Sequence, residues 1–217
     1  MILYQLPVSI YAFKVRLALA LKGVQVELRE PPGGTYRSAE YRAIVPAATV
    51  PALVDGDLVL TESDAIIEYL DETHPPAILL PGDPVRRARA RMLSRYNDFH
   101  LEPHLRALFP HVPPAGREPG VVAERIARIQ AALALVEGGL DPDGPFAAGD
   151  RPGLADCAFP STLMWLDRVL PVLGASPQYG LRTMRMRATM AGVETLQPLI
   201  ATYPPLVQAW IEKRLQA

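Results

Sequence analysis

Cysteine is almost absent from this chain of 217 residues, which has a single thiol at Cys157. One thiol excludes an intrachain disulfide and any metal cluster built from cysteine ligands, and we expect no metal site. A chain without disulfides suits a reducing compartment, so the sequence predicts a cytoplasmic location.

Long hydrophobic runs and an excess of either charge are also lacking. No stretch approaches the roughly 18 apolar residues of a membrane span, and residues 1–7 lack the basic flank and apolar core of a signal peptide. The 22 basic side chains are balanced by 23 acidic ones, which gives no electrostatic reason to expect nucleic acid or a membrane as a partner. With 49% apolar residues, the composition is that of a soluble globular protein with a sizeable core.

The first third of the chain alternates between strand and helix patterns. Residues 2–6 form a short apolar run typical of a strand. Residues 13–22 predict a buried helix that ends at Gly23, and residues 24–28 alternate as a second strand. A polar stretch rich in proline and glycine follows.

A hairpin and a helix are expected next. Asp55-Gly56 stands between the apolar runs 51–54 and 57–60, and this dipeptide supplies the positive φ angles of a tight turn. Thr61 and Asp64 have the spacing of a capping box, which predicts a helix start. That helix carries its larger apolar side chains on one face: Ile66, Ile67, Tyr69 and Leu70.

A dense run of prolines separates this region from the rest of the chain. It predicts a linker at residues 77–84 between a mixed α/β domain (1–76) and an all-α domain (85–217). In the second domain, helices are predicted at about 85–108, 120–137, 154–170, 183–201 and 204–215.

Six short motifs, in this order and spacing, resemble those of the cytosolic glutathione transferase superfamily, in particular serine-type bacterial members (theta-, zeta- or beta-like). The resemblance covers essentially the whole chain. The motifs are SIYAFKVRLAL (9–19), VPAL (50–53), ESDAI (62–66), LPGDP (80–84), GDRPGLAD (149–156), and Tyr203-Pro204 with Trp210.

The resemblance implies a thioredoxin-like N-terminal domain, a C-terminal helical bundle and a homodimer. It also implies that glutathione, as co-substrate, attacks a small apolar electrophile through its thiolate. A thiol with an unperturbed pKa of roughly 8.5 becomes a good nucleophile when a hydrogen-bond donor or a helix N-terminus stabilises its anion.

Ser9 is the residue that the resemblance assigns to this role, because it stands between the first strand and the first helix. Without that context Ser9 would simply be a helix N-cap. Tyr4 is the rival, since some relatives use a first-strand tyrosine. Cys157 is no rival, because it lies in the predicted helical domain.

Glutathione itself is expected to bind at two further motifs. Val50-Pro51 resembles the family's cis-proline step, whose backbone pairs with the cysteinyl part of glutathione; the alternative is a trans proline that begins a strand. Glu62 is expected to accept from the γ-glutamyl ammonium and Ser63 to bind its carboxylate at a helix start. The alternative for this pair is a plain helix cap.

Three departures from the family pattern stand out. Val45-Pro46 and Thr49 replace an Asn-Pro step and a longer side chain, so glutathione is expected to bind weakly at Thr49 or to be anchored elsewhere. Ile10 and Phe13 make the site entrance more apolar. Gly153 stands where a serine or threonine usually caps a central helix, although Asp156 can still accept from backbone amides there.

The second substrate is expected between the domains, against Tyr11, Phe99 and His100. Phe99 is also compatible with ordinary core packing. His100 and His104 lie four residues apart, but no third ligand is apparent, which argues against a metal pair.

Conjugation of glutathione to an electrophile is therefore the predicted reaction. A glutathione-dependent isomerase or dehalogenase is an alternative, although the Ser-Ser-Cys-Ser-like sequence usual in the isomerases is absent. The second alternative is a non-catalytic binding or regulatory protein of the same fold. The sequence does not name the electrophile.

Overall fold

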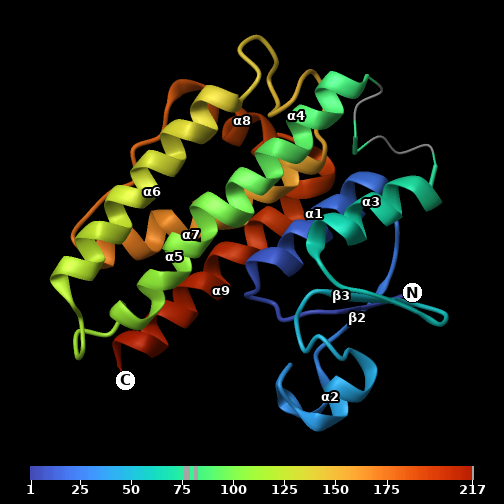
Figure 1. The fold of residues 1–217 in the computed structure, drawn as a ribbon, viewed down its shortest axis with the longest axis horizontal. Helices are drawn as coiled ribbons and strands as arrows, with labels where there is room; N and C mark the ends of the chain where they lie inside the picture. Colours follow the sequence, from blue (N-terminus) through green and yellow to red (C-terminus); the bar gives the residue numbers. More distant parts are fainter. Residues whose placement is uncertain (76–78, 81–82, 217) are drawn as a thin grey trace.

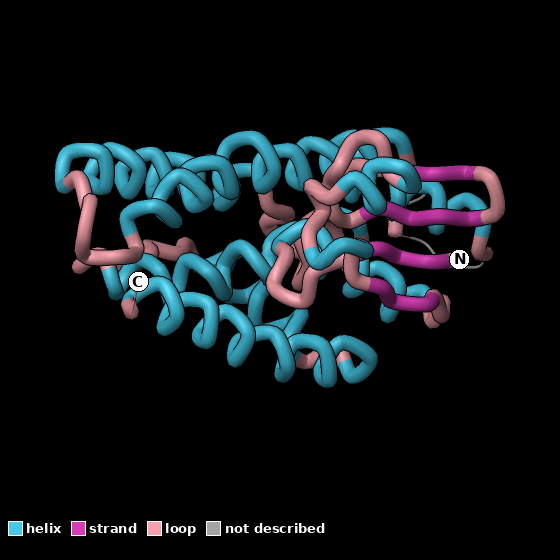
Figure 2. Tube along the Cα trace, turned by 90° about the horizontal axis from the view of Figure 1, so that it is seen from below, coloured by secondary structure: helices cyan, strands magenta, loops and turns pink. Residues whose placement is uncertain are grey.

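The structure is a computed structural model that describes residues 1–75, 79–80 and 83–216. Its N-terminal part contains a four-stranded sheet in the order β2-β1-β3-β4. β1 pairs with β2 in parallel and with β3 antiparallel, and β3 and β4 form the antiparallel hairpin that Asp55-Gly56 predicts. The strands lie side by side at one end of the molecule (Figure 2). They are β1 (Ile2–Tyr4), β2 (Glu27–Arg29), β3 (Ala52–Asp55) and β4 (Leu58–Leu60).

Helices cover both faces of this sheet, α1 and α3 on one face and α2 on the other (Figure 1). The alternation of side chains along a strand explains how both faces are covered. Leu3 joins the large core on the side of α1 and α3, whereas Tyr4 packs with Tyr41 of α2. The helices are α1 (Ile10–Lys22), α2 (Ala39–Ile44) and α3 (Ser63–Thr73), with a 3-10 turn at Pro32–Gly34.

The rest of the described chain is helical, as predicted. The central helix is α7, which packs against α1, α4 and α9 and is buried along most of its length. The elements are α4 (Pro84–Arg95), a π-helical turn (Tyr96–Leu101), α5 (Glu102–Leu108), a 3-10 turn (Phe109–His111), α6 (Pro119–Gly139), α7 (Leu154–Val172), α8 (Leu181–Ala191), a 3-10 turn (Glu194–Leu196) and α9 (Gln197–Leu215).

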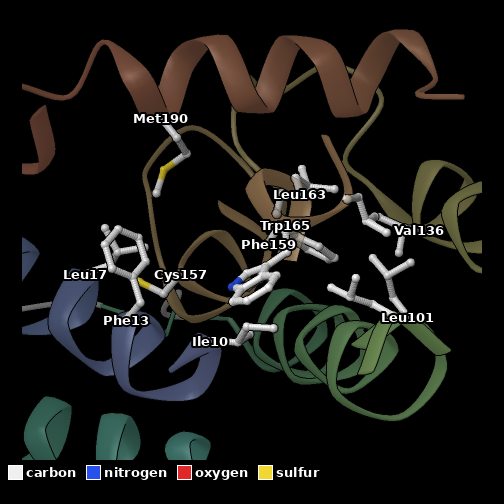
Figure 3. Close-up of a cluster of buried hydrophobic side chains, with 14 of the residues drawn as sticks. Ile10, Phe13, Leu17, Leu101, Val136, Cys157, Phe159, Leu163, Trp165 and Met190 are labelled. Carbon is white, nitrogen blue, oxygen red and sulfur yellow. The ribbon is translucent and has the colours of Figure 1, made fainter. Parts of the chain in front are cut away.

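One continuous core joins the two parts. Figure 3 shows Phe159 and Leu163 of α7 in the same buried cluster as Ile10, Phe13 and Leu17 of α1. Because protein interiors are close-packed, this shared core fixes α1 relative to the helical part. The fold is a small mixed α/β domain on a helical one, as the sequence predicts.

Two predicted elements of the small domain differ from the structure. The second strand is not at 24–28 but at Glu27–Arg29, because the Val24 amide still donates to the Leu19 carbonyl and closes the end of α1. The capping box of Thr61 and Asp64 is also absent. Helix α3 begins at Ser63, and the carboxylate of Asp64 instead lies 2.6 Å from Lys14 Nζ.

The predicted helix 85–108 contains a π-helical turn. Pro103 has no amide hydrogen to continue a regular ladder of hydrogen bonds. The π turn just before it absorbs the mismatch: the Glu102 amide donates to the Asn97 carbonyl, five residues earlier.

The predicted break between residues 201 and 204 is wrong. Helix α9 runs through Pro204 and Pro205, and the chain breaks earlier, after Gly192 at the end of α8. Tyr203 and Val207 of α9 are fully buried, and this tertiary packing outweighs the loss of backbone hydrogen bonds at the two prolines.

Residues 77, 78, 81 and 82 of the predicted linker 77–84 lie outside the described residues, as does Pro76. The boundary between residues 76 and 85 therefore stays a prediction. Among the described helices, none combines the length and the apolar character needed to cross a membrane.

Asp156 joins the start of α7 to the preceding loop. Its carboxylate is buried and accepts from two backbone amides, that of Ala147 at 2.7 Å and that of Gly153 at 3.0 Å. The sequence predicts that Asp156 accepts hydrogen bonds from backbone amides at the helix start. The additional bond from the Ala147 amide also fixes the preceding loop.

Asp156→Ala should lower the free energy of unfolding by about 3 kcal/mol, because the buried amide of Ala147 and the partly buried amide of Gly153 lose their acceptor. Denaturant unfolding measures this. Asp150→Ala is the matched control, since the Asp150 side chain is 81% exposed in the same loop. Equal stability of the two variants would contradict the assignment.

Candidate functional site

A cleft of about 660 Å³ lies between the sheet domain and the helices. Its lining comes from both parts of the chain, so neither domain alone forms the site. The small-domain side consists of Leu6, Val8, Ser9, Ile10, Tyr11, Tyr36, Thr49, Val50, Pro51, Glu62 and Ser63. The helical side consists of Asp98, Phe99, Arg106, Phe109, Trp165, Trp210 and Arg214.

Ser9 lines this cleft as the N-cap of α1. Its Oγ accepts a hydrogen bond of 3.3 Å from the Ala12 amide. The hydroxyl proton has no acceptor among the described residues, so it remains available to a group in the cleft. The N-cap alternative and the functional prediction are thus compatible: the same oxygen begins the helix and presents its proton.

Neither Tyr4, the rival to Ser9, nor Cys157 lines the cleft. The Tyr4 ring packs edge-on against Tyr41 with centroids 5.4 Å apart, on the α2 side of the sheet, and is 6% exposed. Cys157 is fully buried in α7, and burial raises the pKa of its thiol. It is therefore sequestered as a neutral thiol.

Two side chains of the helical part hold the backbone on either side of Ser9. The Tyr203 hydroxyl of α9 donates to the Val8 carbonyl at 2.9 Å. The Ser161 hydroxyl of α7 donates to the Ile10 carbonyl at 3.2 Å. Tyr203 in turn accepts from Trp165 Nε1 at 3.0 Å, so a wall of the cleft is connected to the loop that carries Ser9.

Val50-Pro51 has the cis peptide bond that the resemblance implies, and both residues line the cleft. Thr49 lies beside them with an exposed side chain, and its carbonyl accepts from the Tyr41 hydroxyl at 2.7 Å. The three residues therefore lie together near Ser9, but Thr49 contributes only a short hydroxyl.

Glu62 and Ser63 lie at the N-terminus of α3 and also line the cleft. Glu62 has a φ angle of 67°, in a region that non-glycine residues rarely occupy. Its side chain is exposed and has no partner among the described residues, whereas Ser63 is 6% exposed. A helix N-terminus with a serine favours an anion, and the adjacent carboxylate favours a cation.

A buried ion-pair network lies behind this part of the cleft. Lys14 Nζ, which has no exposed surface, lies 2.6 Å from an Asp64 oxygen and 2.7 Å from an Asp98 oxygen. Burial raises the pKa of Asp98, while the Lys14 ammonium opposes that shift. The network joins α1, α3 and the π turn, and the single Lys14 ammonium is shared between the carboxylates of Asp64 and Asp98.

Of the three residues predicted for the second substrate, Tyr11 and Phe99 line the cleft and His100 does not. The Tyr11 hydroxyl donates to Glu102 Oε2 at 2.9 Å, and burial with this neighbouring carboxylate raises its pKa. Phe99 is 68% exposed at the cleft edge. His100 is exposed and packs edge-on against Tyr96. Phe99 and His100 are adjacent, but only Phe99 lies in the cleft lining.

A metal pair at His100 and His104 is not supported. The His104 ring nitrogen Nδ1 lies 3.3 Å from an Arg125 nitrogen, and burial together with nearby arginines lowers its pKa. No group of three or more potential metal ligands occurs within residues 1–75, 79–80 and 83–216.

The aromatic wall of the cleft was not predicted from the sequence. Rings of Phe109, Trp165 and Trp210 pack together with centroids 4.6 to 5.0 Å apart. Arginines lie at both ends of this cluster: Arg106 is 5.9 Å from the Phe109 centroid and Arg214 is 4.9 Å from the Trp210 centroid. The spacing of Trp210 and Arg214, four residues apart on one helix, was the available signal.

Comparison with known proteins gives the family. Residues 3–78 match the glutathione S-transferase N-terminal domain, and residues 119–213 match the glutathione S-transferase C-terminal domain. A maleylacetoacetate isomerase of Pseudomonas aeruginosa is 36% identical over 179 residues, which cover 78% of this chain and 83% of the relative.

Two solved structures have the same fold along nearly the whole chain. One is a maleyl pyruvate isomerase, a bacterial zeta-class glutathione transferase, with a TM-score of 0.79 and 28% identity over 94% of this chain and 99% of that one. The other is a maleylacetoacetate isomerase of Methylobacterium extorquens with bound malonate and glutathione. It has a TM-score of 0.72 and 28% identity over 95% of this chain and 97% of that one. Since domain order, fold and sequence agree, the chain belongs to the glutathione transferase superfamily.

Proposed function

We propose that this protein is an enzyme that binds glutathione in the small-domain side of the cleft and directs its thiolate at an electrophile on the helical side. The observation that carries the proposal is the Ser9 hydroxyl, which lines the cleft at the N-terminus of α1 with its proton unused. A relative that holds glutathione in its structure supports the choice of co-substrate.

The role of Ser9 is to stabilise an anion rather than to remove a proton. A hydroxyl that donates to sulfur, together with the helix dipole, lowers the pKa of a thiol. Glutathione supplies the nucleophilic sulfur when it is bound. No base is required of Ser9, because the proton can leave to solvent.

The other small-domain residues would hold the tripeptide. Glu62 would accept from the γ-glutamyl ammonium, and Ser63 would donate to its carboxylate at the start of α3. The backbone of Val50 would pair with the cysteinyl part. Thr49 is too short to bind a glycine carboxylate as a lysine would.

A glutathione-dependent isomerase is the second candidate, because the relative that is 36% identical over most of both chains is a maleylacetoacetate isomerase. Both reactions begin with attack by the thiolate on an electrophilic carbon. They differ in whether glutathione stays in the product or leaves again.

Three finer features also belong to this proposal: a homodimer, a cytoplasmic location and a role in detoxification. Val85 and Met92, two exposed apolar side chains seven residues apart on α4, support the pairing of two copies. The buried single cysteine is compatible with a reducing compartment.

Ser9→Ala should retain glutathione on an immobilised column but lose about 10²-fold in kcat/KM towards an aryl halide, because one hydrogen bond to the anion is removed. The pKa of bound glutathione should rise towards about 8.5, so that activity increases only at higher pH. Ser9→Thr, which keeps the hydroxyl, is the control. Turnover of the aryl halide by Ser9→Ala at the wild-type rate would refute the role of Ser9 in stabilising the thiolate. If the wild-type protein neither binds glutathione nor turns over the aryl halide, a non-catalytic protein is favoured.

Glutathione stoichiometry separates the two reactions. A transferase consumes one glutathione for each electrophile converted, whereas an isomerase converts many substrate molecules with a trace of glutathione. We expect consumption with an aryl halide. Titration of free thiol during turnover of the aryl halide measures this consumption. A parallel assay uses a cis-dienoic acid as the second substrate, and conversion of that acid without loss of thiol would assign isomerase activity.

Tyr203→Phe should raise the pKa of bound glutathione, because the Val8 carbonyl next to Ser9 loses its donor. Thiolate absorbance of the complex against pH measures this directly. Tyr179→Phe is the matched control: its hydroxyl donates to Asp167 at 2.8 Å, away from the cleft lining, and its removal should change stability alone. Equal thiol pKa values in both variants would restrict Tyr203 to a structural role.

A further inference from the structure

Two of the four charged side chains that line the cleft have an oppositely charged partner within the protein. Asp98 is paired with Lys14 at 2.7 Å. Arg106 is paired with the buried carboxylate of Glu102, which also accepts from Tyr11. Asp98 and Arg106 therefore each have a counter-charge before a second molecule binds.

Two charges in the lining have no counter-charge within residues 1–75, 79–80 and 83–216: Glu62 and Arg214. They lie on different sides of the cleft. Glu62 is at the start of α3 in the small domain, whereas Arg214 is in the last turn of α9 in the helical part. In the proposed function the ammonium of glutathione satisfies Glu62, which leaves Arg214 to the second substrate.

The surroundings of Arg214 indicate the shape of that substrate. Its guanidinium lies 4.9 Å from the Trp210 centroid, and Trp210 packs on Phe109 and Trp165. Aromatic rings prefer to pack on other aromatic rings, and a guanidinium held on a ring keeps its planar donors for a carboxylate. A flat ring on this wall would place an acidic substituent within reach of Arg214.

We propose that the second substrate is an aromatic electrophile that carries a carboxylate, with its ring on the wall of Phe109, Trp165 and Trp210 and its carboxylate bound by Arg214. This inference rests on the proposed function. It replaces the small apolar electrophile expected from the sequence with an aromatic electrophile that carries a negative charge. In the reaction the sulfur forms a bond to the ring carbon, the carbon–halogen bond breaks, and the halide leaves with the electron pair. The thiol proton goes to solvent.

The test uses chlorodinitrobenzoate, in which chlorine stands between two nitro groups opposite the carboxylate, and its neutral methyl ester. Each kcat/KM is divided by the rate of the same compound with free glutathione, which removes the difference in intrinsic reactivity. The readout is the acid-to-ester ratio of these normalised values. Arg214→Gln should lower the ratio about fivefold, as expected for one charge-assisted contact at a solvent-accessible site, and Arg214→Lys should restore part of it.

Lys213→Gln is the matched control, because it removes the same charge from the same turn of α9 at a residue outside the cleft lining. It should keep the wild-type ratio. An unchanged ratio in Arg214→Gln, or an equal fall in Lys213→Gln, would overturn the inference and leave the proposed function intact. A raised KM for glutathione in Arg214→Gln with an unchanged ratio would instead assign Arg214 to glutathione. If the wild type converts neither compound, both the proposed function and this inference fail.

Discussion

The backbone around Ser9 is held from outside its own domain, and the geometry of the cleft depends on this constraint. A carbonyl just before a helix has no partner within the helix, so it must be satisfied by another part of the fold or by water. Here the Val8 carbonyl accepts from Tyr203 of α9. The Ile10 carbonyl, in the first turn of α1, accepts an additional bond from Ser161 of α7. The helical part thereby determines where the small domain presents its hydroxyl.

The same contacts connect the two halves of the proposed reaction. Trp165 forms part of the aromatic wall and donates to Tyr203, which donates to the residue before Ser9. A chain of two hydrogen bonds therefore runs from the surface expected to meet the electrophile to the loop expected to meet the sulfur. Because both Trp165 and Tyr203 are buried, this chain is shielded from competing water and holds a defined geometry.

Local signals predicted the elements that depend on local chemistry. The hairpin at Asp55-Gly56 and the end of α1 at Gly23 require positive φ angles, which the residue type itself indicates. Ser9 and Val50-Pro51 were identified by motif, and the structure places both in the cleft. The break predicted near Pro204 was wrong because buried packing keeps α9 continuous, and the π turn before Pro103 was not predicted; neither feature can be read from the sequence nearby.

The burial of the single cysteine bears on where the reactive sulfur comes from. Cys157 is sealed in the core with a raised thiol pKa, so the protein provides no reactive sulfur of its own within the described residues. Among the described residues, the cleft lining instead presents a Ser9 hydroxyl proton without an acceptor, and a Glu62 carboxylate and an Arg214 guanidinium without counter-charges. In the proposed function, Ser9 and Glu62 would orient glutathione, and Arg214 would favour a negatively charged second substrate.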